Sequence, residues 1–382
     1  MYYGGQMSEP KLLEARLPAE LSIWAGQLSD MLIKDQDLFH AESAAVVQAG
    51  LESSPWQHLD STGTRVNGIN QHCHVLCNQL YTFYCTTPAK DRRSYLRVLL
   101  GGADPSFRMG ELALAVMEQL KVGPKWSDQL ATVLAADQDF SEEQIDLLLD
   151  LGLPKLGPKV RKDIKDALAI AACRTQVTYP IVRLLLCDDA PQFNWLTLEL
   201  ALCWIHEFRH YKKLVPRFSH HLALLQDFGK QFWKLYKRIL DYRDHPDPSQ
   251  AAAIADEFDQ LMASKSGYQQ LDECKGRTLK KREQLLMVLS HPEILLHNNP
   301  AELGARQRVR KRDVSLQART REGIGAWDTF QTLVATAKKL GVNLFHYFSD
   351  RLTQTYALPS LASLIHERAQ LMGLGASWQQ GP

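Results

Sequence analysis

The chain has 382 residues, of which 45% are hydrophobic, and 44 Lys and Arg residues stand against 43 Asp and Glu residues. This composition excludes a disordered chain, and no run of about 18 apolar residues is present to form a transmembrane helix. The N-terminal sequence lacks the basic-then-apolar pattern of a secretory signal, and seven scattered cysteines are typical of a reducing compartment. We therefore expect a cytoplasmic protein of about two domains, or of one elaborated domain.

The net charge of +1 is the sum of opposed blocks. Residues 126–154 hold seven acids and no base, and residues 155–174 hold six bases and two acids. Residues 305–321 hold seven bases and one acid. The total charge therefore says nothing about a nucleic-acid partner, and the positions of the charges matter instead.

Strand patterns occur in a few places in the first half of the chain. A short strand is expected just before Asp60. Residues 72–87 are rich in Val, Tyr, Phe, Thr and Cys and predict a hairpin that turns at Asn78 and Gln79. The apolar run within residues 180–187 predicts a buried strand.

Helical periodicity dominates the remainder. Residues 101–178 and 216–292 are mostly helical by pattern, and the second segment has apolar side chains spaced by four, three and four residues, namely Phe228, Phe232, Leu235 and Ile239. A further helix is expected to stop at Gly341. The order of the elements predicts an α/β fold in which a mixed sheet carries large helical insertions.

Three acids lie where the pattern predicts the ends of elements. Asp60 precedes a Ser-Thr-Gly sequence, Asp188 follows the buried apolar run, and Glu302 follows Asn298, Asn299 and Pro300. Sites in α/β proteins form at strand ends, and the Asn and Pro residues would place Glu302 in the first turn of a helix.

Three carboxylates beside a dense basic run have a direct chemical interpretation. The acids would bind two divalent cations, and the bases would bind a phosphodiester backbone. The cations would flank the scissile phosphate, activating the attacking hydroxyl and stabilising the leaving oxygen. The competing interpretation is that each acid is an ordinary solvated side chain, because 43 acids offer many triples.

Short motifs surround the second and third acids. Phe193 follows Asp188 by five residues, residues 203–209 read CW-x-H-x-x-R, and residues 298–302 read Asn-Asn-Pro-Ala-Glu, with Arg306 one helical turn later. These motifs, within segments 184–214 and 291–351, resemble those of a bacterial DDE transposase of the insertion-sequence sixty-six type. Asp60 and Thr62 resemble the Asp-x-Thr element of its first strand.

The resemblance implies an RNase H-like catalytic core and Mg²⁺-dependent hydrolysis and strand transfer on DNA, with Mn²⁺ as an alternative cation. It implies that Asp60, Asp188 and Glu302 are the catalytic and metal-binding residues. It also implies that DNA is contacted by a set of basic side chains, namely Arg306, Arg308, Arg310, Lys311, Arg312, His206 and Arg209. The partners would be the element ends and target DNA, handled by a homodimer at the bacterial nucleoid, without a membrane or a small-molecule substrate.

The resemblance also divides the chain. Residues 1–50 would be a helical, shortened DNA-binding region, and residues 51–215 the RNase H-like core with a helical insertion at about 101–178. Residues 216–292 would be a second helical insertion, and residues 293–382 the final catalytic helix and a C-terminal helical region. Two alternatives stay open: an inactive, truncated remnant that binds DNA, and an RNase H-like nuclease that does not transpose.

Four other motifs have competing interpretations. Cys73, His74 and Cys77 suggest zinc, but strand alternation favours buried cysteines. Residues 206–210 read H-E-x-x-H, as in zinc proteases, but they belong to the longer transposase motif. Residues 153–164 resemble a helix-hairpin-helix turn that offers amides to phosphate, or a plain basic helix start. Residues 222–240 could stack on bases, but their stripe is more typical of a core.

Overall fold

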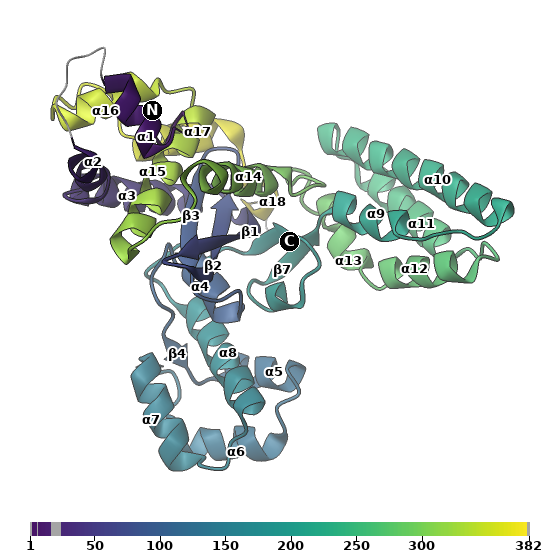
Figure 1. Ribbon diagram of the computed structural model, residues 1–382. Coiled ribbons are helices and arrows are strands. Elements are labelled where there is room, and N and C mark those ends of the chain that lie inside the picture. Colours follow the sequence, from purple (N-terminus) through teal and green to yellow (C-terminus); the bar gives the residue numbers. More distant parts are fainter. Residues whose placement is uncertain (1, 6, 17–23, 380–382) are drawn as a thin grey trace.

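A five-stranded mixed sheet forms the centre of the protein in the computed structural model, which describes residues 2–5, 7–16 and 24–379 (Figure 1). The strand order is β3-β2-β1-β6-β7. The first three strands are antiparallel, and β6 and β7 run parallel to β1. The strand bounds are β1 Trp56–Val66, β2 Ile69–Cys77, β3 Thr82–Thr87, β6 Leu184–Cys187 and β7 Glu199–Leu202. The predicted mixed α/β class is confirmed.

The strand near Asp60 is longer than predicted. β1 continues from Trp56 to Val66, so Asp60 lies within the strand instead of at its end. The chain turns at Asn67 and Gly68, whose φ angles of 49° and 77° are the left-handed values that a tight hairpin requires. The Ser-Thr-Gly sequence that indicated a turn is therefore paired with β2. The predicted hairpin at residues 72–87 is confirmed as β2 and β3.

Helices cover both faces of the antiparallel strands. Alternate residues of β2 point to opposite faces. Cys73 and Val75 pack with Tyr84 of β3 and with Ala305 of α14 (Asn299–Ser315). On the other face, the His74 ring lies 4.8 Å from the ring of Tyr95, a residue of α4 (Arg92–Leu99).

The N-terminal and C-terminal helices pack together beside α15 (Arg321–Lys339), at the top of Figure 1. The N-terminal helices are α1 (Glu9–Arg16), α2 (Ala25–Ile33) and α3 (Asp37–Glu52). The C-terminal ones are α16 (Leu344–Leu352) and α17 (Leu361–Met372), whereas the last helix, α18 (Ala376–Gln379), lies near the centre of Figure 1, with the ring of Trp378 stacked on that of His291 at 3.7 Å. Residues 1, 6 and 17–23 of the predicted helical region 1–50 lie outside the described residues.

A first helical module, formed by residues 107–175, lies below the sheet in Figure 1. It contains β4 (Phe107–Arg108), α5 (Glu111–Gln119), α6 (Pro124–Val133), β5 (Asp139–Phe140), α7 (Glu142–Gly152) and α8 (Pro158–Thr175). Each half runs strand, helix, turn, helix; the second helix of each half begins at Gly-Pro-Lys, and β4 pairs with β5. This repeat was not predicted, because three shared residues are too few to stand out.

The acidic and basic blocks of this module pair with each other. Arg161 of α8 lies 2.8 Å from Asp146 and 2.5 Å from Asp150, both on α7. Lys165 lies 2.7 Å from Glu142 and 2.9 Å from Asp146. Many of the opposite charges that cancel in the net charge therefore also neutralise each other in space, between α7 and α8.

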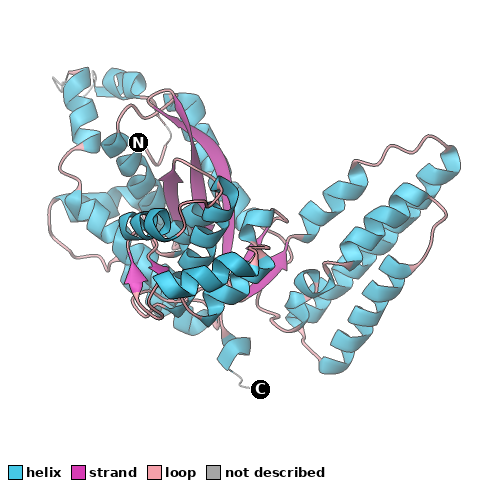
Figure 2. Cartoon of the chain, turned by 90° about the horizontal axis from the view of Figure 1, so that it is seen from below, coloured by secondary structure: helices cyan, strands magenta, loops and turns pink. Residues whose placement is uncertain are grey.

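A second helical module projects from the β7 side of the sheet (Figures 1 and 2). Its elements are α9 (Trp204–Lys212), α10 (Ser219–Asp244), α11 (Pro248–Ala263), α12 (Gln269–Leu279) and α13 (Arg282–Leu285), with short 3-10 helices at Pro191–Phe193 and Met287–Leu289. The predicted apolar face of residues 228–239 is confirmed, because Phe232, Leu235 and Ile239 are fully buried in this module's core. That burial removes them as base-stacking side chains.

Candidate active site

Asp60 and Asp188 stand on neighbouring parallel strands. Trp56 pairs with Leu184 and His58 with Leu186, and the same register continued by two residues sets Asp60 level with Asp188. Asp188 directly follows β6, as predicted, and its Oδ1 accepts the N–H of Ala190 at 3.3 Å. The pairing of β1 with β6 ends at His58, so the Asp60 backbone lies where the sheet opens.

Asn298 anchors the helix that carries Glu302. Its buried side chain donates from Nδ2 to the carbonyl oxygen of Leu59 at 2.8 Å, and its Oδ1 lies 3.0 Å from Nδ1 of His58. Its backbone N–H donates to Sγ of Cys203 at 3.3 Å. The start of α14 is therefore tied to the residue before Asp60 and to the start of α9. Glu302 lies in the first helical turn, as predicted.

Gly304 lets α14 lie close to the sheet. A Cβ atom at this position would stand 2.6 Å from Cγ1 of Val75, which is closer than carbon atoms can pack. The Gly304 carbonyl oxygen also accepts the hydroxyl of Tyr84 at 3.0 Å. The missing side chain thus helps to set the depth at which Glu302 approaches the aspartates.

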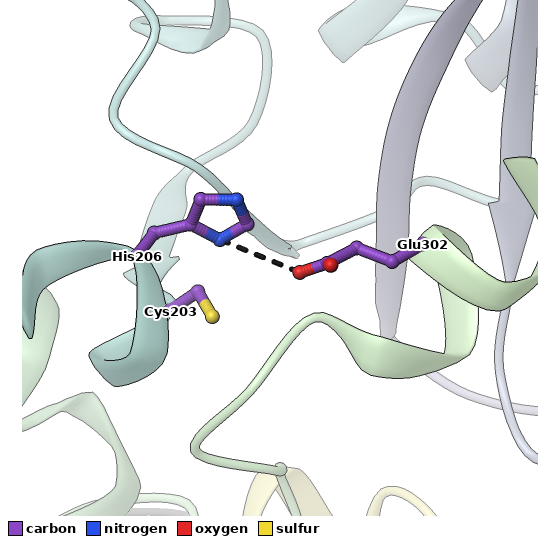
Figure 3. A group of neighbouring side chains, drawn as sticks. All are labelled: Cys203, His206 and Glu302. Carbon is purple, nitrogen blue, oxygen red and sulfur yellow. Dashed lines mark ion pairs between the residues drawn. The ribbon is translucent and has the colours of Figure 1, made fainter. Parts of the chain in front are cut away.

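Glu302 meets side chains from α9 (Figure 3). Its Oε1 lies 3.6 Å from Nδ1 of His206, and its Oε2 accepts from Nη2 of Arg209 at 3.4 Å. One ligand atom from each of Cys203, His206 and Glu302 lies within 4.8 Å of the others. The sequence motif pointed to His206 and Arg209, but not to Cys203 as a neighbour of Glu302.

The three predicted acids influence one another electrostatically. Burial raises the pKa of Asp60 from 3.8 to about 6, and the negative charges of Asp188 and Glu302 add to this rise, while the Ser61 N–H opposes it. Burial and the charge of Arg209 lower the pKa of His206, against the opposing effect of Glu302 and Asp188. Carboxylates on β1, after β6 and on α14 are therefore close enough to repel one another.

The donor set fits a divalent cation. Oε1 of Glu302 and Nδ1 of His206 are both buried and have no hydrogen-bond partner, although they face each other. Carboxylate oxygens are the ligands that Mg²⁺ and Mn²⁺ prefer, and a cation would offset the repulsion among the three acids. Among the described residues, Glu302 is the one of the three acids that stands in a group of possible metal ligands, together with Cys203 and His206.

The basic run on α14 does not form one exposed surface. The side chain of Arg308 is fully buried, where it pairs with Asp328 and lies over the rings of Tyr84 and Trp327. The prediction that Arg308 contacts DNA is therefore wrong.

Lys311 is also fully buried, with Nζ 3.0 Å from the ring centroid of Tyr2. Because its side chain is closed off from the surface, the predicted DNA contact of Lys311 is wrong as well, and burial also lowers its pKa to about 7. Arg306 and Arg310 are exposed on the same helix, and half-buried Arg312 donates to the Gly63 carbonyl oxygen at 2.5 Å. DNA contact by these three arginines stays a prediction.

Two zinc interpretations are excluded by geometry. His74 points to the face of β2 opposite Cys73 and Cys77, and its Nε2 lies 2.7 Å from Oγ1 of Thr87. Glu207 of the H-E-x-x-H sequence points away from Glu302, and its carboxylate accepts from Thr278 at 2.6 Å and from Lys281 at 2.9 Å. It is therefore not free to act as a base beside His206.

Fold and site define an α/β protein in which β1, the end of β6 and the start of α14 lie side by side and each carries one of the three acids. Residues 180–326, less than half of the chain, match the model described as the Transposase IS66 family, so this segment is similar to that family. The match includes Asp188, His206 and Glu302, and Asp60 lies before it. It supports a transposase-type function, which implies DNA as a partner.

The chain is also similar to the uncharacterized protein y4jO of Sinorhizobium fredii. The two are 28% identical over 333 residues, which are 85% of this chain and 100% of the relative. No solved structure matches the chain. Among the helices of the described residues, none has both the length and the apolar character needed to cross a bilayer.

Proposed function

We propose that the protein is a DDE transposase that cuts DNA at the ends of an insertion sequence and joins them to target DNA. One observation carries this proposal: the β1–β6 register, continued by two residues, sets Asp60 level with Asp188, and Asn298 ties the start of the Glu302 helix to Leu59, the residue before Asp60. The IS66 match across two of those acids supports it. The strand order, with three antiparallel strands followed by two parallel ones, supports an RNase H-like core.

The residues of this site would have three roles: metal binding, positioning of Glu302 and contact with a phosphate. Asp60, Asp188 and Glu302 would bind two Mg²⁺ ions, or Mn²⁺ in their place, which supply activation of the attacking oxygen and charge neutralisation at the leaving oxygen. Asn298 and Gly304 position Glu302 through their contacts with β1 and β2. Arg209, half-exposed beside Glu302, would contact a phosphate oxygen of the bound strand.

Two reactions would follow in sequence. Water would attack the phosphodiester at the element end and displace a 3′-hydroxyl. That hydroxyl would then attack a target phosphodiester and displace a new 3′-hydroxyl, so that phosphodiester bonds are conserved in the second step. The two element ends would be paired by a homodimer, as the resemblance implies.

The direct test is cleavage of DNA that carries the element's own ends, with and without Mg²⁺. Asp60→Ala, Asp188→Ala and Glu302→Ala should each abolish cleavage. Asp313→Ala is the matched control, because Asp313 is an exposed acid on the same helix as Glu302. Full activity of Glu302→Ala would contradict the proposal.

The same assay separates the two alternatives. A DNA-binding remnant would bind element ends without Mg²⁺-dependent cleavage by the unmodified chain. A nuclease that does not transpose would cut DNA without joining the freed 3′-hydroxyl to a target. The presence of all three acids at one point favours catalysis over simple binding.

A further inference from the structure

A charged cavity of about 270 Å³ lies beside the carboxylate cluster, where the second helical module meets the sheet. Asp189, next to Asp188, lines it from the end of β6, and Glu207 and His210 line it from α9. Arg277, Lys280 and Lys281 line it from the end of α12 and the turn that follows. The proposed metal-dependent chemistry makes no use of this cavity.

Both acids of the cavity form an ion pair with the same lysine. Lys281 forms an ion pair with Asp189 and a second one with Glu207, the latter at 2.9 Å. Glu207 is only 3% exposed, and its other oxygen accepts the Thr278 hydroxyl. With Arg277 and Lys280 included, three bases face these two acids, so the cavity keeps a positive charge.

The remaining bases of the cavity have no acidic partner. Among the described residues, no ion pair involves His210, Arg277 or Lys280, and all three side chains are exposed. Elsewhere in the same module bases are paired, as Arg282 is with Asp259 at 2.7 Å. Arg277 contacts the Cys274 thiol, and its other N–H groups and those of Lys280, which suit the helix dipole near the end of α12, stay available to a ligand.

The cavity is aligned with the carboxylate cluster along α9. His206, which faces Glu302, precedes His210 by one helical turn, so the two rings lie on the same side of the helix. On the sheet side, Asp188 and Asp189 are adjacent residues. A polyanionic chain held at the carboxylates therefore has a cationic cavity next to it.

We propose that this cavity binds a backbone phosphate of the DNA strand held at the carboxylate cluster, with Arg277 and Lys280 as its main ligands and His210 beside them. The ligand class is a phosphodiester, because two unpaired cations of different geometry can hold its oxygens without reading a base. The inference rests on the proposed function and extends it. It gives the second helical module a direct contact with the substrate.

The test uses the full chain with Asp188→Asn, which blocks cleavage but leaves the cavity in place. Binding to a 30-bp duplex is measured over a range of salt concentrations, with and without the pair Arg277→Ala and Lys280→Ala. The matched control is Lys237→Ala with Lys265→Ala, two exposed lysines of the same module that do not line the cavity.

Removing Arg277 and Lys280 should weaken binding about tenfold, since contacts to charged groups are among the stronger hydrogen bonds. The plot of log K against log salt should become shallower by about 0.9 for each phosphate that these side chains no longer neutralise. The control pair should change neither quantity. Circular dichroism should show unchanged helix content in every variant, because all four side chains are exposed.

Unchanged affinity and slope in the Arg277 and Lys280 variant would overturn the inference alone, provided that the unmodified chain cleaves DNA. Equal losses in both double variants would also overturn it, because the effect would then be one of overall charge. An unmodified chain that neither binds nor cleaves DNA would overturn both the inference and the proposed function.

Discussion

At the scale of single residues, Asp60 is a carboxyl group whose ionisation the fold opposes. Its pKa is raised to about 6, first by burial and then by Asp188 and Glu302. Without a cation, the folded state therefore holds the Asp60 proton at pH values where the unfolded chain has released it. The resulting loss of stability begins near pH 3.8, grows until about pH 6, and stays constant above that value.

Asp60→Asn should therefore stabilise the cation-free protein at pH 7 but leave its stability unchanged at pH values well below 3.8, where both states are protonated. Thermal unfolding in EDTA across this range measures the difference. Adding Mg²⁺ at pH 7 should raise the melting temperature of the unmodified chain more than that of the variant. A difference that does not change with pH would contradict the assignment of the raised pKa to Asp60.

Arg308 and Arg310 lie two residues apart and should behave in opposite ways. Arg308→Met leaves Asp328 without its buried partner and should lower the free energy of unfolding by about 3 kcal/mol. Arg310→Ala removes an exposed charge and should change stability by less than about 0.5 kcal/mol. Urea denaturation distinguishes them, and only Arg310→Ala should weaken DNA binding without loss of stability.

The sequence predicted the positions of the acidic site residues more accurately than the exposure of the basic ones. Asp188 and Glu302 were predicted correctly at the end of a strand and in the first turn of a helix, because local turn and cap residues mark both places. The burial of Arg308 depends on Asp328 and Trp327, which lie about 20 residues further along, and that of Lys311 depends on Tyr2. A run of like charges does not reveal which of its members face inward.

At the scale of elements, the contact of α14 with β2 limits the side chain at position 304. Gly304→Ala should push α14 off the sheet and lower the free energy of unfolding by about 2 kcal/mol, because its Cβ would meet Val75. It should also reduce cleavage by displacing Glu302. Combining it with Val75→Ala makes room, and this double variant should recover part of the cleavage activity; if it does not, the effect of Gly304 has another cause.

Strand β1 shows where local sequence patterns were misleading. Ser61, Thr62 and Gly63 indicated a turn, yet the chain turns at Asn67 and Gly68, a dipeptide typical of tight hairpins. That signal was present in the sequence and would have placed Asp60 within the strand. The repeat of the first helical module was harder to find, because it is defined by the pairing of β4 with β5 more than by shared residues.

At the scale of the whole molecule, Lys281 joins the second helical module to the sheet. It pairs with Asp189 after β6 and with Glu207 on α9. Through Thr278, the same network reaches the hydroxyl of Tyr211 at 2.5 Å. The module is therefore held against the carboxylate cluster by charges as well as by its apolar core.

Lys281→Met should lower the free energy of unfolding by about 3 kcal/mol, because it leaves Glu207 buried and charged with the Thr278 hydroxyl but without a cationic partner. Adding Glu207→Gln removes that charge and should restore part of the loss. Urea denaturation of both variants checks this, and equal instability of the single and double variants would show that Glu207 is not the cause.

The parallel pairing of β1 with β6 has a consequence for how the site tolerates change. Backbone pairing sets β1 and β6 one interstrand spacing apart, about 4.8 Å, up to His58 and Leu186, each two residues before one of the aspartates. This pairing is made by residues 56–58 and 184–186 alone, and the chain between the two strands takes no part in it. Whole helices can therefore be gained or lost between Asp60 and Asp188 without changing the strand register from which both side chains start.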